Sequence, residues 1–123
     1  MQLKEKYKQR LLQILSSVTT PLEVWAYGSR VNGDAHDGSD LDLVIRSQNL
    51  KPLPIDIYVD LCEKIKDSNI PILVELRDWA MLPESFHLII EQQHEVLFSN
   101  LQLILNEASE EYKKPESVIA LKK

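Results

Sequence analysis

The feature that most limits the fold of this chain is a pair of predicted strands joined by a glycine turn and a polar loop. Residues 22–27 are rich in Val and aromatic residues and lead directly into Gly28 and Ser29, and ten mostly polar residues then separate Ser29 from Asp40. Asp40 and Asp42 open a second run, which alternates Asp and Leu before it continues with Val and Ile. This alternation predicts a strand that is exposed at its beginning and buried further along. The two strands therefore form the centre of the predicted fold.

Hydrophobic periodicity predicts helices and further strands around this centre. Residues 55–65 contain β-branched residues that favour a strand, but their apolar positions fit one helical face, so we predict a helix there. The predicted helices are residues 3–15, a short turn at residues 30–32, residues 55–65 and a helix opening at residues 83–85, and the other predicted strands are residues 71–76 and 96–98. We expect an α/β fold with a mixed sheet of three to five strands and helices mainly on one side.

Length and composition agree with one folded domain. The chain has 123 residues, of which 44% are hydrophobic and 27% are charged, and this balance is typical of globular proteins rather than disordered ones. The composition turns polar after Leu105. We expect a domain over residues 1–105 and a polar tail over residues 106–123, which is frayed or folds against a partner.

Charge, cysteine content and hydropathy exclude several classes of function. The formal net charge of -5 argues against direct binding of nucleic acid, which depends on Lys and Arg neutralising phosphates. Cys62 is the single cysteine, so no intrachain disulfide can form. No apolar run approaches the ~20 residues of a membrane span, and the opening residues do not resemble a secretory signal. We expect a cytoplasmic protein without a membrane association.

The four residues Gly28, Ser29, Asp40 and Asp42 form a pattern suited to binding phosphate and metal. A glycine at a strand end permits a sharp turn with open N–H groups, and the Ser29 hydroxyl adds a donor beside them. The two carboxylates project from one face of a strand, where they repel each other unless a cation lies between them. Mg²⁺ prefers such oxygen ligands together with substrate phosphates. The pattern predicts attack on the α-phosphate of a nucleoside triphosphate, with one or two Mg²⁺ ions aligning the reacting oxygens.

Glu75 is the expected third carboxylate of this site. It is the one charge in the apolar run of residues 71–76, where an acid needs a cationic partner or solvent. If its strand lies beside that of Asp42, Glu75 reaches the same metal and can act as general base toward an acceptor hydroxyl. The alternative is an exposed charge on an edge strand, which blocks aggregation. In that case Asp78 is the next candidate.

The pattern resembles the signature of the polymerase β-like nucleotidyltransferase superfamily, and the short chain resembles its minimal nucleotidyltransferase branch. The likeness covers about residues 22–98 and is carried by Gly28-Ser29-Arg30, Gly33 and Ser39-Asp40-Leu41-Asp42-Leu43. The resemblance implies nucleotide binding by Gly28, Ser29, Arg30 and Ser39, and metal binding and catalysis by Asp40, Asp42 and Glu75. The third acid is usually Asp in this family, so Glu75 is a departure.

The resemblance also implies a partner and a reaction. Minimal nucleotidyltransferases are often antitoxins paired with a helical HEPN-domain toxin, and some transfer AMP from ATP to a tyrosine of that toxin. A chain this short has little room for its own acceptor domain, so we expect a hetero-oligomer or a homodimer. The alternative is a catalytically weak module that binds nucleotide and neutralises its partner by complex formation.

Other residues carry weaker signals. Arg30 either contacts a phosphate or is a solvated arginine, and we predict that Trp25 is a core residue rather than a platform for a base. Trp79 and Met81 are candidates for an apolar partner surface. We predict surface positions for the histidines, which lack the spacing of metal ligands: His36, His87 and His94.

Overall fold

The computed structural model describes residues 1–101, which form four helices, four strands and two short 3-10 segments. The helices are α1 (Glu5–Ser16), α2 (Ser29–Asn32), α3 (Ile55–Lys66) and α4 (Glu84–Gln92), and the strands are β1 (Leu22–Tyr27), β2 (Leu41–Ser47), β3 (Val74–Asp78) and β4 (Glu95–Ser99). The 3-10 segments are η1 (Gln48–Leu50) and η2 (Trp79–Met81). The predicted tail, residues 106–123, lies outside the described residues, as does the predicted domain end at residue 105.

The strands form one mixed sheet in the order β3-β2-β1-β4. Strand β1 pairs antiparallel with both β2 and β4, and β2 pairs parallel with β3. A parallel pair needs a crossover connection, which α3 provides between β2 and β3. The predicted α/β class with a mixed sheet is confirmed.

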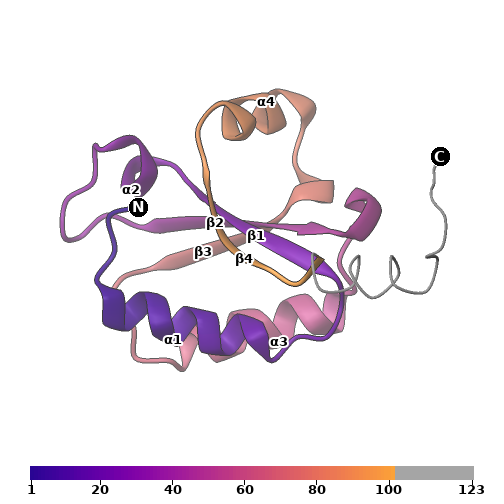
Figure 1. The fold of residues 1–123 in the computed structure, drawn as a ribbon, viewed down its shortest axis with the longest axis horizontal. Coiled ribbons are helices and arrows are strands. Elements are labelled where there is room, and N and C mark those ends of the chain that lie inside the picture. Colours follow the sequence, from indigo (N-terminus) through magenta and orange to yellow (C-terminus); the bar gives the residue numbers. More distant parts are fainter. Residues whose placement is uncertain (102–123) are drawn as a thin grey trace, which may run out of the picture.

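Two helices cover one face of the sheet and hold the larger core. Figure 1 shows α1 and α3 side by side below the sheet, with α4 on the other side. Leu11 and Leu15 of α1 and Leu61 and Ile65 of α3 are buried, as expected for residues spaced four apart on one helical face. They pack in one cluster with Leu43 and other alternate strand residues. Burial of this face stabilises the sheet that carries the polar residues.

The opposite face has a smaller aromatic core under α4. Trp25, Tyr27, Val44, Trp79 and Ile90 form this cluster. Trp25 is buried, as predicted, but the prediction that Trp79 lines an exposed partner surface is wrong, because Trp79 is only 4% exposed. Since strand β3 ends at Asp78, the chain turns at Trp79 back toward the sheet.

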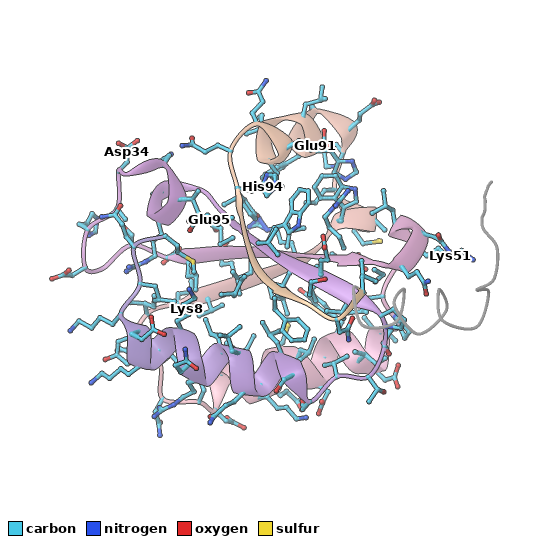
Figure 2. All side chains as sticks on the ribbon, in the orientation of Figure 1. Lys8, Asp34, Lys51, Glu91, His94 and Glu95 are labelled. Carbon is cyan, nitrogen blue, oxygen red and sulfur yellow. The ribbon has the colours of Figure 1, made fainter. Side chains whose placement is uncertain are left out.

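Two histidines are not simple surface residues, contrary to prediction. His87 stacks on Trp79 and His94 stacks on Trp25, with ring centroids 3.9 and 3.7 Å apart. His94 lies between α4 and the sheet (Figure 2). Flat aromatic stacking covers one face of each ring and leaves both histidines half-buried, which a sequence pattern of mixed polar residues did not reveal.

The third strand begins later than predicted. The sequence favoured residues 71–76, whereas β3 covers Val74–Asp78. The register pairs Leu41 with Val74, so the hydrogen bonds of β2 reach only the later residues of the run. The shift brings Arg77 into the strand beside Glu75.

None of the helices in the described part of the chain is long and apolar enough to span a membrane.

Candidate active site

Three side chains form a row across strands β1, β2 and β3. Asp42 pairs with Tyr27 on one side and with Glu75 on the other, and paired residues of neighbouring strands share a face of the sheet. Leu41 and Leu43 point into the core under α1 and α3. Asp42 lies between them in sequence, so its side chain projects from the opposite face. The structure thus places Asp42 and Glu75 side by side, which is the condition for Glu75 to serve as the third carboxylate of the site.

The glycine turn lies directly against Asp42. Gly28 has φ +81, and a Cβ atom built on it would lie 2.5 Å from Oδ2 of Asp42. Any side chain at this position would therefore displace the carboxylate. Ser29 begins helix α2, and the first N–H groups of a helix have no acceptor within the helix. The open turn and the carboxylate form one continuous polar surface.

Negative charge accumulates around Asp42. Burial raises the pKa of the Asp42 carboxyl, and the neighbouring charges of Glu75 and Asp40 raise it further, while Arg77 acts in the opposite direction. Asp40 is exposed and directly precedes β2, and its charge is the smallest of these contributions. A divalent cation would relieve this repulsion.

Glu75 is held by a neighbouring arginine. Nη2 of Arg77 lies 2.8 Å from Oε1 of Glu75, and both side chains are more than a third exposed. Within residues 1–101, no group of three or more His, Cys, Asp or Glu side chains is arranged to hold a metal ion. Metal binding by Asp40, Asp42 and Glu75 together therefore stays a prediction.

Asp78 is not an alternative to Glu75. Its Oδ2 accepts a hydrogen bond from the Leu53 N–H at 2.8 Å, and its Oδ1 accepts one from the Ala80 N–H at 3.1 Å. It pairs with Ile45, three positions beyond the Asp42 row. Residues three apart on a strand face opposite sides, so Asp78 fixes the turn into η2 and points away from Asp42.

Arg30 organises the loop. The alternative of a solvated side chain is wrong, because the residue is only 7% exposed, whereas a phosphate contact by Arg30 stays a prediction. The residue is buried, and its guanidinium donates to the carbonyls of Ser39 (3.0 Å), Gln2 (2.6 Å) and Asp37 (3.1 Å). A buried arginine needs these acceptors because its charge is costly without them. The loop before Asp40 is thus tied to the N-terminal segment.

Ser39 is also engaged within the loop. Its hydroxyl accepts a hydrogen bond from the His36 N–H at 2.9 Å. His36 itself is exposed, as expected, and its Nδ1 accepts from the Gly38 N–H at 3.1 Å. Figure 2 shows Asp34 at the outer end of this loop. A nucleotide contact by Ser39 stays a prediction, since its hydroxyl already stabilises the turn.

Sequence reasoning missed Tyr27. Its hydroxyl is buried and has no hydrogen-bond partner among residues 1–101. Burial raises the pKa of the phenol, Asp42 and Glu75 add to the effect, and Arg77 opposes it. The one available signal was its position at the end of β1, directly before Gly28, where strand pairing places it beside Asp42.

A cavity of about 610 Å³ opens beside the glycine turn. Its apolar walls come from Tyr27 and α4, and amide side chains stand at its rim. The lining residues are Tyr27, Gly28, Asn32, Phe86, Ile89, Ile90, Gln92 and Gln93. Ligand sites commonly combine such apolar walls with a few polar groups.

Known proteins resemble most of the part of the chain that the structure describes. The family described as polymerase beta, nucleotidyltransferase, matches residues 9–102. A Haemophilus influenzae protein described as probable protein adenylyltransferase MntA is 40% identical over 84 residues, which cover 68% of this chain and 72% of that protein.

Two solved structures share the fold. A crystal structure of a toxin-antitoxin with AMP-PNP has a TM-score of 0.61 at 16% identity, with 85% of this chain and 90% of that chain covered. A crystal structure of the toxin-antitoxin MntA-HepT has a TM-score of 0.56 at 15% identity, with 89% and 87% covered. Both likenesses concern the fold.

Proposed function

This chain belongs to the polymerase β nucleotidyltransferase family, and we propose that it transfers AMP from ATP to a hydroxyl group of a partner protein. The observation that carries the proposal is the contact between the glycine turn and the neighbouring carboxylates of Asp42 and Glu75, which we call the acidic row. Gly28 leaves room for the Asp42 carboxylate, and Glu75 is its neighbour in register. A phosphate-binding turn and metal-binding carboxylates must adjoin in this way if both are to contact one triphosphate.

The donor set suits Mg²⁺. Asp40 and Asp42 supply the carboxylate oxygens that this ion prefers. Burial raises the pKa of Asp42, and the charges of Glu75 and, to a smaller extent, Asp40 raise it further, so a cation beside these carboxylates is favoured. When bound, Mg²⁺ supplies positive charge to the phosphates. Ser29 and the turn N–H groups would then hold the triphosphate by hydrogen bonds.

The cavity beside Gly28 suits the nucleoside. The aromatic rings of Tyr27 and Phe86 and the side chain of Ile90 offer an apolar surface to a base. The amides of Gln92 and Gln93 at the rim can both donate and accept hydrogen bonds, as a heteroaromatic edge requires. In transfer, the acceptor oxygen bonds to the α-phosphorus, the bond to the bridging oxygen breaks and pyrophosphate leaves. Glu75 would take the proton of the acceptor hydroxyl.

We propose a HEPN-domain toxin as the partner, a tyrosine as the acceptor and an antitoxin role for this chain. Support comes from the 40% identical relative, named an adenylyltransferase, and from fold neighbours that are toxin-antitoxin proteins. Large apolar side chains stand exposed on the described surface, which suits a partner: Ile55, Leu73, Met81, Leu88, Ile89 and Val96.

A second candidate is a nucleotide-binding module that neutralises its partner by complex formation alone. The ion pair of Glu75 with Arg77 favours it, because a paired Glu75 is not free to take a proton.

The test is incubation of the chain with the protein encoded beside its gene, Mg²⁺ and ATP labelled on the α-phosphate. We expect label on the partner's tyrosine, lost in Asp42→Asn and in Glu75→Gln. Asp60→Asn is the matched control, because Asp60 is an exposed acid on α3, on the far face of the sheet. Tight binding of the partner without transfer by the wild type would support the module and contradict the enzyme.

A further inference from the structure

Arg77 occupies a position that the proposed reaction does not yet use. It follows Glu75 by two residues on β3, so both side chains leave the same face, and it pairs across the sheet with Val44. Its guanidinium bonds to Glu75 at 2.8 Å, and its side chain is 39% exposed. It therefore stands at the edge of the acidic row with one side open to solvent.

The charge of Arg77 acts on the whole row. It lowers the pKa of both Asp42 and Tyr27, against the effects of burial and of the neighbouring acids. A guanidinium bonds equally well to carboxylate and phosphate oxygens. Arg77 can thus exchange one partner for the other without losing its charge interaction.

We propose that Arg77 is a positioning residue that holds Glu75 in the nucleotide-free protein and releases it when a triphosphate arrives. This inference rests on the proposed function. In the free protein the guanidinium takes the place of a cation beside Glu75, so a divalent metal must compete with it. The phosphates offer Arg77 a replacement partner, and Glu75 then turns to the metal beside Asp42. The third carboxylate therefore joins the site only when substrate is present.

The half-exposed geometry makes this exchange feasible. Ion pairs open to solvent contribute little net stability, because water competes for both groups. Glu75 is in register with Asp42, so only its side chain must turn. The backbone of β3 remains paired throughout.

The test is Mn²⁺ affinity, measured by electron paramagnetic resonance of the free ion in nucleotide-free protein. Arg77→Gln should tighten Mn²⁺ binding by roughly tenfold, because the competing charge is removed. The same change in a Glu75→Gln background should alter the affinity less than about twofold, since no carboxylate remains to be released. Arg77→Lys should keep the wild-type affinity. Lys66→Gln, on α3, is the control for loss of a distant positive charge.

Nucleotide affinity provides a second measurement with the opposite sign. Arg77→Gln should weaken binding of a non-hydrolysable ATP analogue by roughly tenfold, because a phosphate partner is lost. If Arg77 had only a structural role, Arg77→Gln would weaken the binding of Mn²⁺ and of the ATP analogue together. Equal effects of Arg77→Gln on Mn²⁺ in the two backgrounds would overturn the inference while leaving the proposed function intact. If Asp42→Asn leaves Mn²⁺ and nucleotide affinity unchanged, the metal centre fails and the inference with it.

Discussion

Replacing Gly28 with alanine tests the central contact of the site. Gly28 has φ +81 and ψ -156, a conformation that costs a residue with a side chain roughly 1–3 kcal/mol. The new Cβ would meet Asp42 Oδ2 at 2.5 Å, so the carboxylate must leave its rotamer, at a further cost of roughly 1 kcal/mol. We expect a loss of about 2–4 kcal/mol of unfolding free energy, or roughly 8–16 °C in Tm for a domain of this size.

Gly33→Ala is the matched control. Gly33 also has positive φ, +93, but a Cβ there would meet nothing within 4 Å. It should lose only about 1 kcal/mol, from backbone strain. Thermal denaturation reports both losses, and calorimetry with ATP and Mg²⁺ should show affinity reduced more than about tenfold in Gly28→Ala and nearly unchanged in Gly33→Ala.

Combining Gly28→Ala with Asp42→Ala isolates the part of the stability loss that comes from the steric clash. Truncating Asp42 to alanine removes the atom that the new Cβ would strike, so Asp42→Ala should recover about 1 kcal/mol of the stability lost in Gly28→Ala. If the two glycine variants lose equal stability and bind ATP equally well, the contact between the turn and the carboxylate does not shape the site.

Four further outcomes are expected. Arg30→Met should lower the unfolding free energy measured in urea by roughly 2–4 kcal/mol, because its carbonyl partners lose their donors. Arg30→Lys should recover only part of this stability. A loss under about half a kcal/mol in Arg30→Met would contradict the role of Arg30 in holding the loop. The raised pKa of Asp42 means that its ionisation opposes folding, so this loss of folding free energy is absent below the unfolded pKa and complete above the folded pKa. Asp42→Asn should therefore stabilise the protein at neutral pH but not in acid. Denaturation measured across pH checks this sign. Tyr27→Phe should raise the unfolding free energy by roughly 1 kcal/mol, since it removes a buried hydroxyl that no group in the described part of the chain bonds, and a lower Tm would show that the hydroxyl is bonded. Gln93→Ala should weaken ATP binding by roughly 1 kcal/mol and leave inorganic triphosphate unaffected in calorimetry, whereas equal losses would place the nucleoside elsewhere.

The sheet was predictable because its signals are local. Alternation places Asp40 and Asp42 on one face, and a glycine between a strand and a polar loop marks the turn. The parallel pairing of Glu75 with Asp42 was expected only conditionally, since it depends on the register between distant segments. The start of β3 was missed for the same reason: the paired register with β2 begins only at Val74, and of the apolar residues before it Leu73 accepts a single hydrogen bond from the Leu41 N–H.

The roles of the polar residues depend on three-dimensional partners that spacing does not reveal. Arg30 follows the glycine turn in sequence, yet its guanidinium donates to the backbone carbonyls of Gln2 and Asp37. Asp78 is an acid like Glu75 and lies near it in sequence, but the two are three positions apart on the strand, so Asp78 faces the other side of the sheet. Charge type and sequence distance are therefore poor guides to function where backbone groups compete for the same side chain.

The neighbouring Arg77 gives a physical reason why residue 75 is a glutamate rather than an aspartate. An aspartate in register with Asp42 would hold its carboxylate close to the strand, whereas glutamate carries it one methylene further. Arg77 lies one side-chain position along the same face, and the longer side chain reaches its guanidinium at 2.8 Å. The same length allows rotation about an additional bond, which carries the carboxylate between Arg77 and the row of Asp42. Residue 75 thus combines a resting ion pair with access to the acidic row. The departure from the usual aspartate of the family and the presence of Arg77 belong to one arrangement.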